Sequence, residues 1–131
     1  SEPAPLLYED DSYPYSPATF AAVFRSSKNN RFYMTTNLAE EPCINCWPRN
    51  KIYIAEINPE NCRIIKNSVT LIDEEEHDPQ SPSSGRMSNF QWYEDRHTRD
   101  IVLYVPHLGC SREATYRYDL ELPNRRGERI L

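Results

Sequence analysis

The residues best equipped for chemistry stand close together in the second half of the chain. Tyr93 and Glu94 are adjacent, and arginines lie on both sides of them. A tyrosine beside a carboxylate offers a nucleophile and an acid–base group, and arginines bind anionic groups through paired hydrogen bonds. The candidate catalytic residues are therefore Tyr93 and Glu94, and the candidate substrate-binding residues nearby are Arg86, Trp92 and Arg96.

Strand geometry sets a condition on this candidate site. Successive residues of a strand point to opposite faces, so Tyr93 and Glu94 reach one pocket only where a bulge intervenes. The alternative is that residues 93–96 are the end of a strand that runs into a charged, solvated turn.

A further candidate substrate-binding residue is Tyr15, which lies in the proline-rich segment 13–17. Loops carry binding residues more often than strands do, which favours a role in binding. The alternative is a loop stiffened by its prolines, whose tyrosines cover a sheet.

The cysteines leave three interpretations open. An even number of cysteines in an exported chain suits two disulfides, with three connectivities to choose from. Free buried thiols are the second interpretation. The third is a zinc site, because Cys43, Cys46 and Cys110 together with His107 supply the ligands of a Cys3His centre. The residues considered for disulfides are Cys43, Cys46, Cys62 and Cys110.

The acidic run 73–78 and the glycine content limit other ligand chemistry. Charge runs usually form solvated faces, so we expect this run to be exposed and not to bind calcium. The chain has only three glycines, which disfavours a glycine-rich loop that would cradle a nucleotide phosphate. No cofactor and no metal is expected.

The composition narrows the class of partner. The 131 residues carry 15 Lys plus Arg and 20 Asp plus Glu, a formal charge of −5, which argues against nucleic-acid binding because phosphate contacts need a basic face. No apolar run approaches the roughly 18 residues that span a bilayer, so no membrane partner is expected. The chain does not begin with methionine, and we expect a mature or excised chain that is secreted or periplasmic.

Short strands joined by stiff loops are the expected architecture, because eleven prolines and three glycines disfavour long helices. Alternating patterns predict a mostly β fold of antiparallel strands, arranged as about two propeller-like blades or, alternatively, as a small β-sandwich. The expected units are an extended segment 1–17, a four-stranded unit 18–73, a linker 74–87, a second β unit 88–122 and a tail 123–131.

Four phrases of the sequence are familiar together: Tyr13-Pro14-Tyr15-Ser16-Pro17-Ala18, Arg31-Phe32-Tyr33-Met34-Thr35-Thr36-Asn37, Lys51-Ile52-Tyr53-Ile54-Ala55-Glu56-Ile57 and Ser88-Asn89-Phe90-Gln91-Trp92-Tyr93-Glu94-Asp95-Arg96. They resemble the C-terminal part of sialidase-like β-propeller proteins, also described as BNR-repeat or exo-sialidase-like. The resemblance covers roughly residues 12–122, and the last phrase is its most specific part.

The resemblance implies blades around a central pocket and a glycan as the partner. The chain departs from the family because the Asp-box pattern Ser-x-Asp-x-Gly-x-Thr-Trp does not occur in it. At about 40–50 residues per blade, the chain is also too short for a whole propeller. We therefore expect part of a sialidase-like propeller that binds or hydrolyses a glycan, inactive in isolation, with self-association through open sheet edges. The alternative is a non-catalytic extracellular β-rich interaction domain.

Overall fold

The computed structural model describes residues 1–124, and it is built from two antiparallel β-sheets. The strands of the first sheet are β1 (Ala22–Arg25), β2 (Phe32–Asn37), β3 (Lys51–Asn58), β4 (Arg63–Ile64) and β5 (Thr70–Glu74). A short 3-10 helix, η1 (Lys66–Ser68), precedes β5. The strands of the second sheet are β6 (Arg86–Met87), β7 (Gln91–Glu94), β8 (Ile101–Leu108) and β9 (Ala114–Leu120). The expected mostly β, antiparallel fold is confirmed.

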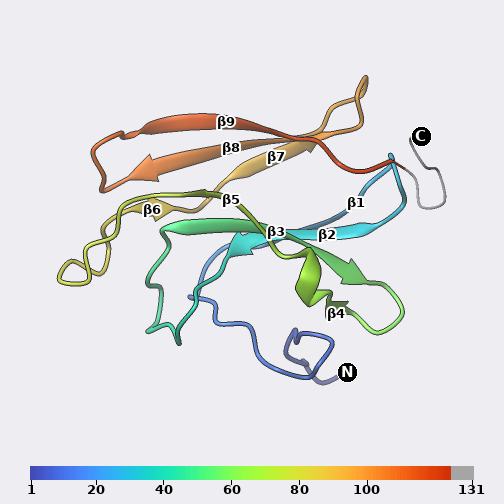
Figure 1. Ribbon diagram of the computed structural model, residues 1–131, viewed down its shortest axis with the longest axis horizontal. Helices are drawn as coiled ribbons and strands as arrows, with labels where there is room; N and C mark the ends of the chain where they lie inside the picture. Colours follow the sequence, from blue (N-terminus) through green and yellow to red (C-terminus); the bar gives the residue numbers. More distant parts are fainter. Residues whose placement is uncertain (125–131) are drawn as a thin grey trace.

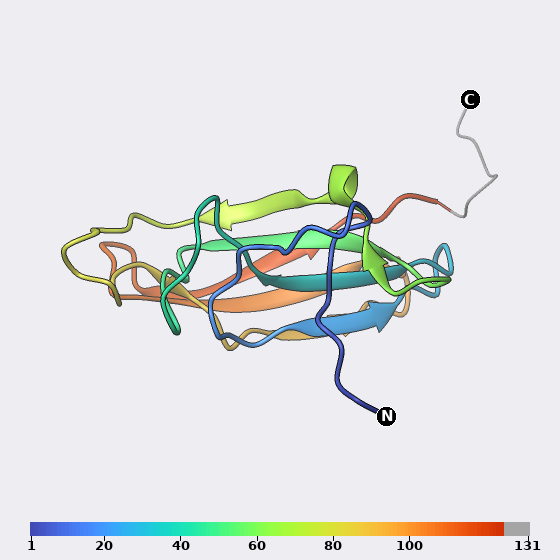
Figure 2. The same cartoon turned by 90° about the horizontal axis from the view of Figure 1, so that it is seen from below.

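The two sheets lie face to face, which is the arrangement of a β-sandwich (Figures 1 and 2). β1, β2 and β3 pair in sequence order, and both β4 and β5 then pair with β3. In the second sheet β8 is central, between β9 on one side and β6 and β7 on the other. Among the described strands, β1 and β9 each have one neighbour and lie at sheet edges.

Alternation along the strands decides which side chains enter the space between the sheets. In β3, Ile52 is fully buried and Ile54 packs against the same interior, while Ala55 and Ile57 face the other side of the sheet. In β9, Tyr118 and Leu120 point inward, as their period-two spacing predicts. The sequence pattern of both strands is confirmed by their burial.

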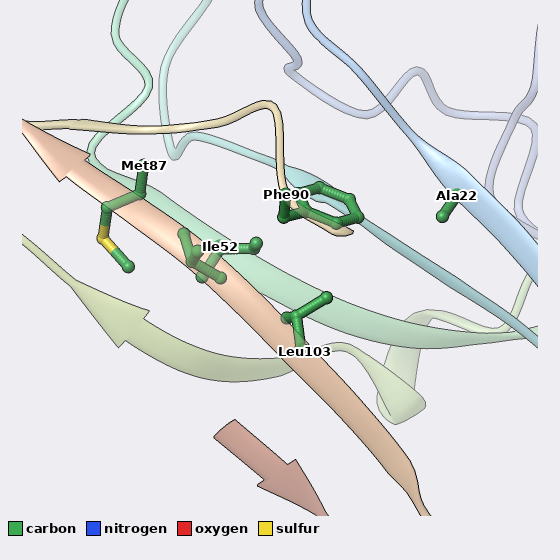
Figure 3. Close-up of a cluster of buried hydrophobic side chains, with 6 residues drawn as sticks. Ala22, Ile52, Met87, Phe90 and Leu103 are labelled. Atoms are coloured by element: carbon green, nitrogen blue, oxygen red, sulfur yellow. The ribbon is translucent and has the colours of Figure 1, made fainter. Parts of the chain in front are cut away.

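The central cluster of the interior is filled by aliphatic side chains and the phenyl ring of Phe90. Phe90 is only 1% exposed and its ring lies edge-on to Phe20, with ring centroids 5.1 Å apart. Figure 3 shows the side chains converging from both sheets. Fully burying such a side chain stabilises the fold by roughly 1.5–3 kcal/mol. The members of this cluster are Ala22, Ile52, Met87, Phe90, Leu103 and Val105.

The outer face of the first sheet is covered by the N-terminal segment. Tyr8 forms a parallel bridge with Ile64, and its ring packs against the buried Met34, Ala55 and Ile57. The amide of Ile64 donates to the carbonyl of Leu7 at 2.9 Å. The segment expected to be extended over residues 1–17 therefore also packs against the outer face of the first sheet.

A buried amide side chain connects the two sheets. Asn37 is fully buried, and its Nδ2 donates to the carbonyl of Lys51 in the first sheet and to that of Met87 in the second, both at 2.8 Å. Its Oδ1 accepts a hydrogen bond from Thr19 Oγ1 at 2.8 Å. Buried polar groups are stable only when they are paired in this way.

The expected linker 74–87 contains the strand β6 and one deeply placed carboxylate. Glu75 is 7% exposed, so the expectation that the whole acidic run 73–78 is solvated is wrong at this position. The physical reason is a set of cationic partners, described below. The tail expected over 123–131 lies outside the described residues from residue 125 onward.

Candidate functional site

The two ends of the sandwich differ in character. The tight turns β1–β2, β3–β4 and β7–β8 gather at one end, on the right of Figure 1. Two longer loops and one short connection gather at the other end, on the left of Figure 1, and we call it the loop end. They are the cysteine loop (residues 38–50), the proline loop (residues 76–85) and the β8–β9 connection (residues 109–113).

Trp92 and Glu94 both contact the first half of the chain near the end where the tight turns gather. The Trp92 ring lies against Phe24 of the first sheet, with ring centroids 4.7 Å apart. Both carboxylate oxygens of Glu94 accept hydrogen bonds from Ser27, one from the backbone amide and one from the hydroxyl, each at 2.8 Å. Glu94 therefore joins the end of β7 to the β1–β2 turn.

Tyr93 lies on the opposite face of β7 from Glu94. Its ring stacks on Tyr104 with ring centroids 6.4 Å apart, and it is 45% exposed. The ladder between β7 and β8 runs without a bulge from Gln91 to Glu94. The condition set for a shared pocket is therefore absent, and the structure does not bring Tyr93 and Glu94 together.

The other candidate residues are dispersed. Arg96 is exposed in the turn after β7, at the tight-turn end. Arg86 and Tyr15 lie near the loop end: Arg86 Nη1 donates to the carbonyl of Ser83 at 3.4 Å, and the carbonyl of Tyr15 accepts from the amide of Ala39 at 2.9 Å. The six candidate residues thus form no common pocket in residues 1–124.

The geometry of Glu94 leads to a prediction about stability. Replacing Glu94 with alanine removes both acceptors of Ser27, and we expect the free energy of unfolding to fall by about 1 kcal/mol. Urea unfolding of the variant measures this change, with Arg96→Ala as the exposed control from the same turn region. A loss indistinguishable from that of the control would contradict the bracing role of Glu94.

A groove of about 640 Å³ opens at the loop end, between the cysteine loop and the proline loop. This volume is in the range of pockets that hold small molecules. Pro79 and Pro82 form part of its second wall. The polar and aromatic side chains that line it are Glu40, Glu41, Asn45, Trp47, Asn50, Lys51 and His77.

The charges in the groove are mostly negative. Lys51 is the cation that lines it, and its Nζ is 3.6 Å from a carboxylate oxygen of Glu40 and 3.9 Å from one of Glu74. Glu41 lines the groove as well and is exposed. The positive charge of Lys51 is therefore already shared by carboxylates before any ligand enters.

Trp47 supplies an aromatic surface to the groove. The guanidinium of Arg49 lies 5.3 Å from the centre of its ring, close enough for an attractive cation–π contact. The backbone around Trp47 is held by a two-way pair of hydrogen bonds with Ile44, each 3.1 Å long. The indole is thus positioned by its own loop.

The proline loop is closed by hydrogen bonds of its own. His77 Nδ1 lies 3.0 Å from the carbonyl of Ser84, which can only accept, so Nδ1 carries the proton. The amide of Asp78 donates to Ser84 Oγ at 2.8 Å. At the base of the loop, Gly85 has a φ of +61°, and a Cβ there would lie 1.9 Å from the carbonyl oxygen of Glu76. Only glycine fits this closure.

A cluster of charged and polar side chains lies behind the proline loop and joins the two sheets. We call Asp73, Glu75, His107, Arg112 and Tyr118 the charge cluster. His107 is fully buried; its Nδ1 is 2.6 Å from Glu75 Oε2, and its Nε2 is 2.8 Å from the Tyr118 hydroxyl. Arg112 donates to both carboxylates, to Glu75 at 2.8 Å and to Asp73 at 3.0 Å.

The hydrogen bonds assign the protons of this cluster. The Tyr118 hydroxyl donates to Asp73, so it must accept from His107 Nε2. Glu75 is an acceptor when ionised, so Nδ1 of His107 must donate to it. Both ring nitrogens of His107 are therefore engaged, one by Glu75 and one by Tyr118, and Arg112 bridges the two carboxylates.

The pKa values of the carboxylates agree with this assignment. Burial acts to raise the pKa of Glu75, but hydrogen bonds from His107 and Arg112 outweigh it and hold that pKa below its usual range. Burial also opposes ionisation of Asp73, and hydrogen bonds from Tyr118, the Glu74 backbone and Arg112 lower its pKa overall. Burial and the neighbouring Asp73 raise the pKa of Tyr118, so its hydroxyl keeps its proton.

The cysteines are free thiols in the structure. Burial raises the pKa of the Cys43 and Cys110 thiols, which keeps them protonated at neutral pH. Both ring nitrogens of His107 are occupied by Glu75 and Tyr118, so His107 has no lone pair for the zinc ion considered above. Within residues 1–124, no group of three or more His, Cys, Asp or Glu side chains is placed to hold a metal ion.

Sequence reasoning missed the groove and the charge cluster. A period-two pattern that puts His107 in line with the apolar Val105 was a usable signal that this histidine is buried. Nothing in the sequence paired it with Glu75, because 32 residues separate them. A second signal was the tryptophan Trp47 in the cysteine loop, but the sequence showed only that it is there and not the groove that it lines.

Comparison of the chain with models of protein families, with curated proteins and with solved structures gives no match. Among the described residues, no helix has both the length and the apolar character needed to cross a membrane.

Proposed function

We propose that this protein is a glycan-binding β-domain and that the groove at the loop end is its binding site. The observation that carries the proposal is a single groove that combines one aromatic surface, Trp47, with amides and carboxylates of the cysteine loop and with His77 of the proline loop. A sugar ring presents an apolar face that stacks on an indole, and hydroxyls at its edge that bond to groups such as Asn45 and Asn50.

The charge of the groove favours neutral glycans over anionic ones. Sequence reasoning placed arginines at an anionic sugar, but Arg86 and Arg96 do not line the groove. Glu40 and Glu41 do, and they would repel the carboxylate of a sialic acid. Hydroxyl groups, by contrast, can donate to these carboxylates.

The wider proposal is that the domain belongs to a sialidase-like propeller. Two antiparallel sheets that follow one another in the chain and pack face to face are compatible with consecutive blades, and the open edges at β1 and β9 leave room for further pairing. Secretion is part of the same proposal. Hydrolysis by Tyr93 and Glu94 stays a prediction for a complete propeller, and for this chain we propose binding alone.

Tryptophan fluorescence tests binding at the groove directly. The chain has only two tryptophans, so a Trp92→Phe variant leaves Trp47 as the single indole. Titration of this variant with neutral oligosaccharides such as lactose, N-acetyllactosamine and cellotetraose is expected to change the Trp47 emission. Lactose and 3′-sialyllactose form a matched pair, and we expect the sialylated sugar to bind more weakly.

The predicted effect of removing the aromatic surface is large. We expect Trp47→Ala to weaken glycan binding, measured by calorimetry, by roughly tenfold or more, because central tryptophans dominate such contacts. Tyr93→Ala is the matched control, an exposed aromatic far from the groove. Loss of binding in Tyr93→Ala with full binding in Trp47→Ala would refute the groove and favour the site on β7.

A further inference from the structure

We infer that Glu75 is a positioning residue for the groove: its carboxylate, held by His107 and Arg112, fixes the proline loop that forms the second wall. The binding role of the groove rests on the proposed function. No side chain of the charge cluster lines the groove, so the effect passes through the backbone.

The first link is the attachment of residue 75 to the end of β3. The amide of Glu75 donates to the carbonyl of Asn50 at 2.8 Å, and Asn50 Nδ2 donates back to the carbonyl of Glu75 at 3.1 Å. Asn50 itself lines the groove. A shift of the Glu75 backbone therefore moves a lining residue and the start of the proline loop together.

The second link is at the other end of the proline loop. The amide of Gly85 donates to the carbonyl of Gly109 at 2.9 Å. Gly109 lies in the same β8–β9 segment that presents His107 and Arg112 to Glu75. Both ends of the loop that carries His77 are thus fastened to one short stretch of chain.

The side-chain contacts of Glu75 are strong enough to act as the fastening. Its side chain is 4% exposed, and Oε2 accepts from His107 at 2.6 Å and from Arg112 at 2.8 Å. Charge-assisted hydrogen bonds of this length in a buried site are among the strongest in proteins. The other groups around His107 are Asp73 and Tyr118, the Tyr116 ring, the Cys110 thiol beside Glu75 and the uncharged Met87 of β6.

The test compares Glu75→Gln with Glu76→Gln, which removes the same charge from the adjacent exposed residue. Amide hydrogen exchange is followed at residues 75 and 85, whose donors form the two links, and at Ser26, whose amide bonds to Arg31 at the tight-turn end. In Glu75→Gln we expect exchange at residues 75 and 85 to accelerate roughly tenfold or more, with Ser26 much less affected. Glu76→Gln is expected to behave as the wild type.

Ligand binding is measured on the same variants with cellotetraose, lactose and N-acetyllactosamine as probes. Glu75→Gln is expected to weaken binding by roughly tenfold, and Glu75→Asp, which keeps the charge but shortens the side chain, is expected to fall between Glu75→Gln and the wild type. Arg112→Gln, a change at a half-exposed residue, is a milder second variant. We expect it to accelerate amide exchange at residues 75 and 85 and to weaken sugar binding, as Glu75→Gln does.

The outcomes separate the two claims. Failure of the wild type to bind any of these sugars refutes the proposed function. Amide exchange at residues 75 and 85 still tests whether Glu75 fixes the proline loop. Unchanged exchange at those amides, or an equal rise at Ser26, overturns the positioning role. Faster exchange with unchanged affinity also overturns it and leaves the groove as a binding site.

Discussion

Replacing Phe90 with alanine is expected to lower the free energy of unfolding by about 3–5 kcal/mol, because the change removes a phenyl ring from the centre of the sandwich. The ring is 1% exposed and packs among side chains from both sheets, including Ile52 and Leu103. The surrounding strands are hydrogen-bonded on both sides in β3 and β8, so they cannot collapse into the space that the ring leaves.

Equilibrium unfolding in urea measures this loss, and Tyr93→Ala is the control. Tyr93 is also aromatic and lies only three positions further along, but it is 45% exposed on the outer face of β7. We expect its replacement to cost less than about 1 kcal/mol. Equal losses in the two variants would contradict the assignment of Phe90 to the core.

Removal of His107 is the second change with a large expected effect. His107→Ala breaks a buried hydrogen-bonded pair with Glu75 and leaves the Tyr118 hydroxyl without its donor. Breaking a buried pair by removing one partner costs about 3–5 kcal/mol. His97→Ala, in the exposed turn after β7, is expected to have little effect and serves as the control.

The cost of removing His107 is expected to depend on pH in the acid range. The fold lowers the pKa of Glu75 from its usual 4.5 and that of Asp73 from 3.8, so it favours the ionised forms. Their stabilisation is complete above the unfolded pKa values and is lost as the pH falls through the folded ones. The unfolding free energies of wild type and His107→Ala, measured from pH 7 to pH 3, should therefore approach each other as the pH falls below these usual pKa values. A constant difference over this range would contradict the ionised pairing of Glu75.

Local patterns were sufficient to predict the longer strands, but not β6, which lies in the segment expected to be a linker. Alternation in residues 51–57 and 116–122 matches the burial of Ile52 and Ile57 and the partial burial of Leu120. Residues 26–30 lie in the turn between β1 and β2. These signals are local because a strand repeats every two residues and a turn needs only a few. The small β-sandwich considered for the chain is compatible with the packing of the two sheets.

The candidate site could not be predicted in the same way, because its contacts are distant in the sequence. The acidic run 73–78 has the composition of a solvated surface, and only the approach of His107 and Arg112 makes burial of Glu75 favourable. The groove likewise depends on two loops that meet only in the fold.

The phrase Ser88–Arg96, the most specific part of the family resemblance, has structural roles here. Phe90 fills the core, Trp92 packs on Phe24, and Glu94 bonds to Ser27. A strand of this kind is constrained at alternate positions by packing. Its residue types are therefore explained without catalysis, although a complete propeller could add a second role.

The buried side chain of Asn37 has a consequence for the order of folding. Its nearer partner, Lys51, lies 14 residues away, within reach of the β2–β3 connection, but Met87 lies 50 residues away. Each sheet can begin to form by pairing strands that are neighbours in the chain, and closing a long loop has an entropic cost that local pairing avoids. The amide of Asn37 gains its last hydrogen bond only when the sheets meet. We therefore expect docking of two partly formed sheets to be a late event in folding, with the hydrogen bond from Asn37 to Met87 forming at that step.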